Sequence, residues 1–306
     1  MQSLSAGSTD LTQATEAPSS LPSPIGWKLR GQSLIWGQRT YLMGILNVTP
    51  DSFSDGGLFN SVSAALAQAQ CLANARIDIL DIGGQSTRPQ ALEVSLDIEM
   101  ERVIPVIQAI RQQLSIPISV DTTRAAVAAA AIAAGADLVN DVSGGTYDPA
   151  MLPTVARLGV PIVLMHLRGN SQTMQQLTTY TDLIGEIYQV LEQRVEAAVA
   201  AGVARELIAI DPGIGFAKTA AQNIEILRQL SRFRSLGCPL LVGPSRKQFI
   251  GYVLDQPQPQ DRIWGTAAAC CAAISGGADL IRIHDGAPMW QVCRMADAIW
   301  RLSKPQ

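Results

Sequence analysis

The sequence predicts an α/β protein in which one (β/α)8 barrel follows a short N-terminal hairpin and a disordered N-terminal tail. Three observations support this fold class. Short β-type runs alternate with helical patterns, two kinds of connector recur between them, and most of the β-type runs end in polar residues. About eight such units indicate a parallel sheet with helices on its outside. With 306 residues, of which 47% are hydrophobic, the chain can bury one large core.

The N-terminal segment differs in composition from the rest of the chain. Residues 1–25 are rich in Ser, Thr, Ala and Pro and contain no Lys or Arg. Such a segment cannot bury enough apolar surface to become ordered, and it lacks the basic start and apolar centre of a secretory signal. We therefore expect a disordered tail at 1–25 and one domain at 26–306. Two short runs between Trp27 and Trp36, on either side of Gly31, predict a hairpin before the barrel.

The predicted barrel strands follow in order, each before a helical pattern. They are Tyr41–Asn47, Ile77–Asp81, Ile116–Asp121, Asp137–Asp141, Pro161–His166, Leu207–Asp211, Leu240–Gly243 and Leu280–His284. Leu-x-x-Pro precedes three of them and Gly-Ala-Asp-Leu precedes two. In both connectors a helix ends and a strand starts within a few residues, as short αβ loops require. A doubly wound open sheet is the alternative, but no Gly-x-Gly-x-x-Gly follows the first strand.

Composition limits the classes of function. The net charge of −3 and the pI near 5.4 provide no basic face for nucleic acid. No apolar run approaches the roughly 20 residues of a membrane-spanning helix. The five cysteines are scattered and include no Cys-x-x-Cys pair, which favours a reducing compartment. We therefore expect a cytoplasmic protein that acts on small molecules, without a nucleic-acid or membrane partner.

Polar residues at the strand ends mark the predicted site, because the active sites of such barrels lie at the carboxyl ends of the strands. In chain order these residues are Asn47, Asp81, Asp121, Asn140 with Asp141, His166, Asp211, Ser245 just after the seventh strand, and Arg282 with His284. Capped strand ends and satisfied core carboxylates could explain any one of them, but not easily the whole set.

These side chains divide into two chemical sets. Asp121, Asn140 and Asp211 would present fixed acceptors to the N–H groups of a flat, nitrogen-rich heterocycle. The second set is cationic and would hold a phosphate or diphosphate with backbone N–H groups after Ser245. It comprises Arg88, Arg246, Lys247, Arg282 and His284.

Metal and hydrolase motifs are missing from the sequence. No group of His, Cys or carboxylates has the spacing of a zinc or iron site. A Mg²⁺ ion that arrives with a diphosphate needs few protein ligands, and the side-chain carbonyl of Asn47 is the best candidate. The absence of Gly-x-Ser-x-Gly argues against hydrolysis through an acyl-enzyme.

The ordered set of motifs from Tyr41 to the last helix resembles the dihydropteroate synthase family. The matching segments are Asn47-Val-Thr-Pro-Asp-Ser-Phe-Ser-Asp-Gly-Gly57, Asp81-Ile-Gly-Gly-Gln-Ser-Thr-Arg-Pro89, Ser119-Val-Asp-Thr-Thr123, Asn140-Asp-Val-Ser143, Leu164-Met-His166, Asp211-Pro-Gly-Ile-Gly-Phe216, Ser245-Arg-Lys247 and Arg282-Ile-His-Asp285. The resemblance implies a pterin-binding barrel enzyme of folate biosynthesis. Such an enzyme joins 6-hydroxymethyl-7,8-dihydropterin diphosphate to 4-aminobenzoate and releases diphosphate.

The resemblance also implies roles for individual residues. Lys247, Asp121, Arg282 and His284 would be catalytic, and the substrates would be bound by Thr87, Arg88, Asp121, Asn140, Asp211, Ser245, Lys247, Arg282 and His284. Asn47 would meet Mg²⁺, the expected cofactor. Thr49 to Gly57 would act as a lid with a glycine hinge, and Thr87 and Arg88 would belong to a second mobile loop. The homodimer that we expect rests on the resemblance alone.

Two positions depart from the family pattern, and two other functions stay open. Gln85 stands where the family usually has Glu, and Ala217 where it usually has Gly. Both put the fine geometry of their loops in doubt but not the reaction class. A methyltetrahydrofolate methyltransferase would use a similar barrel without a diphosphate. A pterin-binding protein without catalysis is the alternative from a different functional class.

Overall fold

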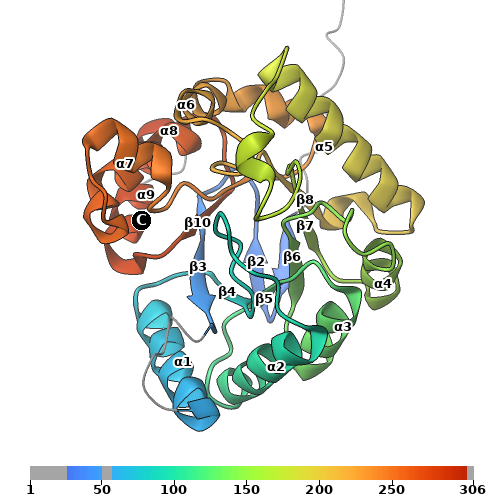
Figure 1. The fold of residues 1–306 in the computed structure, drawn as a ribbon. Helices are drawn as coiled ribbons and strands as arrows, with labels where there is room; N and C mark the ends of the chain where they lie inside the picture. The colour runs from blue at the N-terminus through green and yellow to red at the C-terminus, as the bar shows by residue number, and fades with distance from the viewer. Residues whose placement is uncertain (1–25, 50–56, 302–306) are drawn as a thin grey trace, which may run out of the picture.

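The computed structural model describes residues 26–49 and 57–301. The predicted tail at 1–25 and most of the predicted lid lie outside the described residues. Within the described part, the chain forms a ring of parallel strands surrounded by helices, as Figure 1 shows.

The ring consists of eight parallel strands. They are β3 (Tyr41–Asn47), β4 (Ile79–Gly83), β5 (Ile118–Asp121), β6 (Leu138–Asp141), β7 (Ile162–Met165), β8 (Ile208–Asp211), β9 (Leu241–Val242) and β10 (Leu280–Ile283). Their order in the sheet is β8-β7-β6-β5-β4-β3-β10-β9. A parallel bridge between Ile210 and Leu240 joins the two ends of that order. The sheet therefore closes into the predicted (β/α)8, or TIM, barrel.

Helices connect consecutive strands on the outside of the barrel. They are α1 (Gly57–Asn74), α2 (Leu96–Gln113), α3 (Ala125–Ala134), α4 (Met151–Leu158), α5 (Leu183–Ala200), α6 (Ala220–Arg228), α7 (Gln248–Leu254), α8 (Ile263–Ser275) and α9 (Gly286–Trp300). Short 3-10 turns lie at Met174–Gln176, Arg205–Leu207, Leu230–Leu236 and Pro259–Arg262. Seven of the eight predicted strands contain an observed strand within their bounds, although most observed strands are one or two residues shorter. The second predicted strand, Ile77–Asp81, is shifted by two residues in the structure.

This shift places Asp81 in the middle of β4, and its prediction as a strand end is wrong. Asp78 belongs to the connector before the strand, where its Oδ2 accepts a hydrogen bond from the backbone N–H of Leu42 at 2.8 Å. Asp137 and Asp279 do the same at the start of two other strands. Asp137 accepts from the N–H of Ile118 at 2.8 Å, and Asp279 from that of Leu240 at 3.1 Å. The repeated Gly-Ala-Asp-Leu connector thus supplies an acceptor for the adjacent strand.

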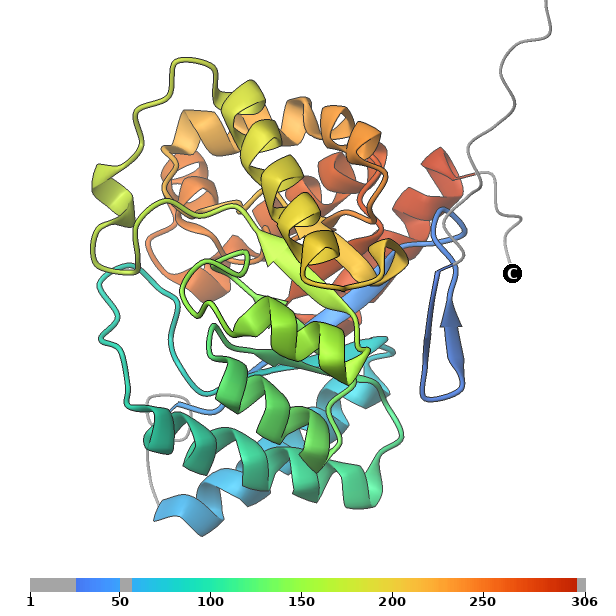
Figure 2. The same ribbon diagram turned by 90° about the vertical axis from the view of Figure 1, so that its right-hand side faces the viewer.

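The inside of the barrel is apolar at the amino ends of the strands. Side chains alternate across a strand, so every second residue points inward. The inward cluster contains Met43, Ile79, Leu138, Val163, Ala209, Leu241 and Leu280, whereas the intervening residues pack against the helices. The predicted hairpin, formed by β1 (Trp27–Leu29) and β2 (Gln32–Leu34), adds buried Trp27 and Leu34 to this inward cluster. It therefore covers one end of the barrel, opposite the long β4–α2 and β7–α5 loops (Figure 2).

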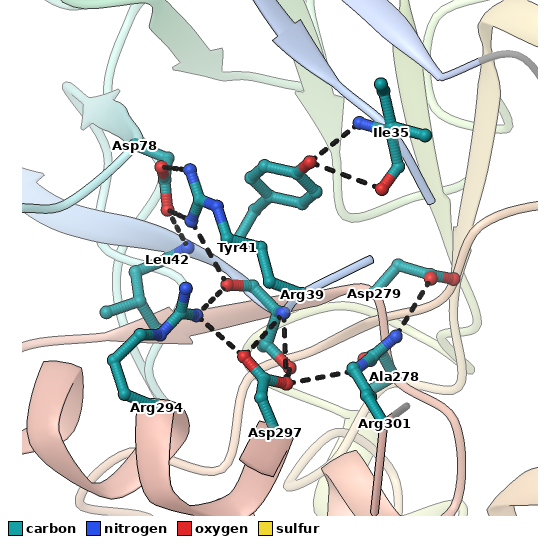
Figure 3. Close-up of polar contacts among 11 residues, drawn as sticks. Ile35, Arg39, Tyr41, Leu42, Asp78, Ala278, Asp279, Arg294, Asp297 and Arg301 are labelled. Atoms are coloured by element: carbon teal, nitrogen blue, oxygen red, sulfur yellow. Dashed lines mark hydrogen bonds and ion pairs between the residues drawn. The ribbon is translucent and has the colours of Figure 1, made fainter. Parts of the chain in front are cut away.

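A polar network at the same end ties the last helix to the first barrel strand (Figure 3). Asp297 of α9 is 4% exposed and accepts hydrogen bonds from the backbone N–H of Thr40 at 2.9 Å and from its hydroxyl at 2.6 Å. Arg294 and Arg301 each form an ion pair with Asp297 at 2.9 Å. Both arginines therefore have Asp297 as their partner, in a buried cluster that lies away from the predicted site.

Candidate active site

Above the apolar layer, the inward positions of the barrel become polar. Asp81 follows Ile79 at the next inward position of β4, Asn140 follows Leu138, Asp211 follows Ala209, and Arg282 follows Leu280. Asp121 ends β5 on the same side of its strand as Ser119. All four acidic or amide side chains are at most 6% exposed. Because parallel strands bring these positions to one end of the barrel, the predicted convergence of Asp121, Asn140 and Asp211 on one wall agrees with the fold.

A chain of hydrogen bonds joins four of these residues. Arg282 donates from Nε to Asp81 Oδ2 at 2.5 Å and from Nη2 to Asp121 Oδ2 at 2.7 Å. Asn140 donates from Nδ2 to the same oxygen of Asp81 at 3.2 Å. The guanidinium therefore lies between the carboxylates, and the two chemical sets that the sequence suggested are not separate in space.

The pKa of Asp121 reflects this environment. Burial raises the pKa of its carboxyl to about 7, although the positive charge of Arg282 lowers it. For Arg282, burial lowers the pKa, but the charges of Asp81 and Asp121 outweigh it and leave the pKa above its ordinary value. Arg282 stays charged, whereas Asp121 can gain a proton near neutral pH.

Asp211 and Lys247 form a second pair of groups at the mouth. Asp211 Oδ1 accepts from the backbone N–H of Gly213 at 2.7 Å, and burial raises the pKa of this carboxyl to about 6. Burial, followed by the charge of Arg282, lowers the pKa of Lys247 to about 8. The Lys247 ammonium lies 4.1 Å from the centre of the Phe216 ring. A side chain at Gly215 would lie only 2.8 Å from Lys247 Cδ, so this close approach requires glycine.

The turn that carries Ser245 and Lys247 is held from outside the barrel. Arg246 has a φ of +59°, which is costly for a residue with a side chain. Its guanidinium donates to both oxygens of Asp285, at 2.9 and 2.5 Å. Its backbone N–H donates to Thr266, and its carbonyl accepts from Arg262. Arg246, which the sequence placed in the cationic set, therefore forms an ion pair with Asp285 that supports the strained turn.

Ser245 follows β9 and His284 follows β10, and the two residues contact each other. The hydroxyl oxygen of Ser245 accepts from the backbone N–H of His284 at 3.1 Å and lies 3.0 Å from Nδ1 of its ring. Since that oxygen already accepts one hydrogen bond, its own proton is suited to Nδ1, which leaves the ring proton on Nε2. Burial, followed by the charge of Arg282, lowers the pKa of His284 to about 3. His284 is thus a neutral donor, and its assignment to a set of cations is wrong for this state of the protein.

A buried Lys–His pair was not predicted from the sequence. Lys218, in the loop after β8, is 3% exposed and lies 3.0 Å from Nδ1 of the fully buried His166. It also donates to the carbonyl of Phe216 at 2.9 Å. Burial lowers the pKa of Lys218 to about 7 and that of His166 to about 2. His166, a predicted strand-end residue, therefore supports the loop that carries Phe216.

The remaining predicted residues lie on the rim. Asn47 ends β3, is partly exposed and pairs in register with Gly83, which pairs in turn with Asp121. Thr87 lines the same pocket as Asp121 and Phe216. Arg88 is exposed on the β4–α2 loop, and its charge contributes to the lowered pKa of His284. These three residues therefore surround the mouth rather than its inner wall.

Comparison with known proteins agrees with this geometry. The family model described as "Pterin binding enzyme" matches residues 43–284. The chain belongs to the pterin-binding enzyme family. A dihydropteroate synthase from Synechocystis is 61% identical over 272 residues, which cover 89% of this chain and 94% of that protein.

Solved structures of family members have a similar fold. The Xanthomonas albilineans dihydropteroate synthase with 4-aminobenzoic acid has a TM-score of 0.81 and 43% identity, covering 85% of this chain and 93% of that chain. The same enzyme in complex with 7,8-dihydropteroate has a TM-score of 0.78 and 41% identity, covering 85% and 94%. In the described part of the chain, none of the helices could cross a membrane.

Gln85, one of the two departures from the family pattern, anchors the β4–α2 loop. Its Oε1 accepts from the backbone N–H of Val94 at 3.2 Å. Further along, Arg124 donates to the carbonyl of Val94 and to the carboxylate of the buried Glu99, both at 2.6 Å. The loop tip is held by Ser171, whose carbonyl accepts from the N–H of Gln90 at 2.8 Å. An amide at position 85 can make its contact without adding a charge beside Glu99.

Ala217, the other departure, is fully buried with a φ of +51°, in the left-handed region. Replacing it by glycine relieves about 1–2 kcal/mol of backbone strain. That gain offsets the loss of one buried methyl group, about 0.8 kcal/mol, and the added flexibility of glycine in the unfolded chain, about 0.5–1 kcal/mol. We expect Ala217→Gly to change the free energy of unfolding by less than about 0.5 kcal/mol.

A matched control for this prediction is Ala128→Gly in α3. Ala128 is also fully buried but lies in a regular helix, so glycine relieves no strain there. We expect that variant to lose about 1–2 kcal/mol. Equal losses in the two variants, measured by denaturant unfolding, would show that Ala217 is not strained.

Proposed function

We propose that this protein is a dihydropteroate synthase, which condenses 6-hydroxymethyl-7,8-dihydropterin diphosphate with 4-aminobenzoate to give 7,8-dihydropteroate and diphosphate. The observation that carries the proposal is the inner wall of buried carboxylates and an amide, with Lys247, Arg282 and His284 beside it. Family relatives solved with 4-aminobenzoic acid and with 7,8-dihydropteroate support it. Formation of 7,8-dihydropteroate from the two substrates by the purified protein tests it directly.

Asp121, Asn140 and Asp211 bind the pterin in this proposal. A pterin presents several N–H groups along one edge, and ionised carboxylates are strong fixed acceptors for them. Asn140 donates from Nδ2 to Asp81, so its Oδ1 is the atom left to accept from the substrate. Lys247 supplies a donor for the ring acceptors. Its contact with the Phe216 ring holds it at the mouth between pterin and arylamine.

Arg282, His284 and Ser245 bind the diphosphate, together with Thr87 and Arg88 from the β4–α2 loop. The C–O bond between the pterin methylene and diphosphate breaks, and its electron pair leaves with the diphosphate. The amine nitrogen of 4-aminobenzoate then bonds to the methylene carbon and loses a proton to solvent. Arg282, fixed between Asp81 and Asp121, and the Nε2–H of His284 stabilise the growing negative charge. The carboxylates stabilise the positive charge that develops on the pterin.

We propose Mg²⁺ as the cofactor, held by Asn47 together with oxygens of the diphosphate. Among residues 26–49 and 57–301, no group of three or more His, Cys, Asp or Glu side chains could hold a metal. A single amide oxygen at the barrel mouth nevertheless fits Mg²⁺, which binds through few protein ligands when a diphosphate supplies the others. When bound, the ion neutralises charge on the leaving group.

The pH dependence of kcat/KM follows from the buried groups. In the free enzyme the pKa values of Asp121 and Asp211 are raised to about 7 and 6, and that of Lys247 is lowered to about 8. As the pH falls through 7 and 6, the carboxylates take up protons and lose their strength as acceptors. As it rises through 8, Lys247 loses its charge. We expect a bell-shaped profile with its maximum between about 7 and 8.

Lys247→Met provides the control for that profile. The variant should be less active, but its alkaline limb should disappear while its acid limb remains. A profile that is flat from pH 5 to 7 in the wild-type protein would contradict the proposed role of the two carboxylates.

We further propose that the protein is a cytoplasmic homodimer. Three neighbouring helices, α7, α8 and α9, carry the large exposed apolar residues Tyr252 (82%), Trp264 (79%) and Met295 (63%). Such residues favour a partner surface, and the free cysteines of the described chain favour a reducing compartment. Sedimentation of Trp264→Glu beside the wild-type protein tests the dimer, since a charge at the interface should yield monomers.

A further inference from the structure

Asp81 is a buried carboxylate of the inner wall that contacts neither substrate in the proposed reaction. It lies in the middle of β4 and its exposed fraction is 0%. Its register partner on β5 is Ser119, one inward position below Asp121. Asp81 therefore lies beneath the proposed pterin site, where its side chain is covered by the residues that would contact the substrate.

One oxygen of Asp81 fixes two of those residues from opposite sides of the barrel. Oδ2 accepts from Arg282 Nε on β10 at 2.5 Å and from Asn140 Nδ2 on β6 at 3.2 Å. A carboxylate can only accept, so it determines which end of the Asn140 amide points down. With Nδ2 directed at Asp81, the acceptor Oδ1 is the end presented to the substrate.

The guanidinium of Arg282 is fixed in a similar way. Its Nε donates to Asp81 and its Nη2 to Asp121, so two carboxylates define the plane of the group. Without Asp81, Arg282 would keep one anchor and could rotate about it. The groups that face the diphosphate would then no longer be held in one orientation.

We propose that Asp81 is a positioning residue of the reaction, which sets the amide orientation of Asn140 and the guanidinium plane of Arg282 without touching either substrate. The inference rests on the proposed dihydropteroate synthase activity. Asp81, beneath the site, would thereby determine which hydrogen-bonding groups of Asn140 and Arg282 face the pterin and the diphosphate.

The charge of Asp81 also provides a signature that a purely structural role would not produce. Asp121 is surrounded by Arg282, Asp81, Glu99 and Asp141. Burial raises the pKa of Asp121, Arg282 lowers it, and the negative charges of the three acids raise it again. Removal of the Asp81 charge should therefore lower the pKa of Asp121, and the acid limb of kcat/KM should move to lower pH.

The test is the isosteric variant Asp81→Asn, compared with Ser119→Ala in the same layer. Ser119 is fully buried, and its hydroxyl has no hydrogen-bond partner within residues 26–49 and 57–301, so its removal should leave the kinetics close to those of the wild type. For Asp81→Asn we expect kcat/KM for the pterin diphosphate to fall about 10²-fold, because its binding groups are misplaced. The acid limb should shift to lower pH.

A double variant shows whether Asp81 acts through Asn140. If it does, Asp81→Asn should have a clearly smaller effect on pterin binding in an Asn140→Ala background than in the wild type. If Asp81→Asn does not fold, Asp81→Ser allows the same comparison, because serine is smaller than aspartate and carries no charge.

Two results would overturn the inference: an unshifted acid limb with wild-type kcat/KM, or an effect no larger than that of Ser119→Ala. Either result is separable from a failure of the proposed function, because that function is judged by turnover of the wild-type protein alone.

Discussion

Asp121→Asn is expected to lower kcat/KM for the pterin diphosphate by about 10²- to 10³-fold. The amide has one acceptor in place of an ionised carboxylate, and hydrogen bonds to charged groups contribute about 1.5–3 kcal/mol each. The variant also removes one of the two carboxylates that hold Arg282, at 2.7 Å from its Nη2. Since about 1.4 kcal/mol corresponds to a factor of ten, the two losses together account for the expected range. Steady-state kinetics with 4-aminobenzoate at saturation measures it.

His284→Ala separates the two halves of the substrate. His284 contacts Ser245 and has a pKa of about 3, so it acts on the diphosphate as a neutral donor. We expect this variant to bind 6-hydroxymethyl-7,8-dihydropterin, which has no diphosphate, as tightly as the wild type does. It should bind inorganic diphosphate about tenfold more weakly. In titration calorimetry, Asp121→Asn should weaken binding of the pterin more than binding of diphosphate, which it affects only through Arg282. Wild-type affinity of both variants for both ligands would contradict the site assignment.

Asp297→Ala is expected to lower the free energy of unfolding by about 3–5 kcal/mol. Asp297 is the shared anion of Arg294 and Arg301, and it also accepts from the backbone and the hydroxyl of Thr40 (Figure 3). Removal of the buried carboxylate takes away the nearest acidic partner of both arginines, and Arg301 keeps only the more distant Asp279, at 3.9 Å. Equilibrium unfolding in guanidinium chloride measures the loss.

Glu196→Ala is the control for that prediction. Glu196 forms an ion pair with Arg205 at 2.8 Å, but its side chain is 60% exposed, so we expect a change below about 1 kcal/mol. The folded Asp297→Ala protein should keep wild-type kcat at 25 °C, because the cluster lies at the end of the barrel away from the site. A loss equal to that of Glu196→Ala would mean that the buried cluster contributes little to stability.

The strand order and the polar wall could be predicted from the sequence because both depend on local patterns. Alternating β-type runs and short connectors indicate a barrel, and a barrel brings the carboxyl ends of its strands together. Asp121, Asn140 and Asp211 were found in this way. The shift of β4 by two residues was not, since Ile77 is as apolar as the strand itself. Only the contact between Asp78 and Leu42 shows where the strand begins.

Contacts between side chains from distant strands could not be predicted in the same way. Arg282 was grouped by the sign of its charge, but its partners Asp81 and Asp121 lie 201 and 161 residues away in the chain. Lys218 lies outside the predicted strand ends, and its burial against His166 depends on the fold of its loop. The left-handed backbone of Ala217 could have been predicted from the sequence. Ala217 stands where the family usually has glycine, and a residue that replaces such a glycine can retain the left-handed conformation.

Catalysis of alkyl transfer by this site can be tested directly in one assay. Purified protein with Mg²⁺ and 6-hydroxymethyl-7,8-dihydropterin diphosphate is assayed for diphosphate release with and without 4-aminobenzoate. We predict release that depends on the arylamine and equals the amount of 7,8-dihydropteroate formed. Binding of both substrates without turnover would contradict the account and favour a pterin-binding protein without catalysis. Turnover of methyltetrahydrofolate in place of the diphosphate would favour a methyltransferase.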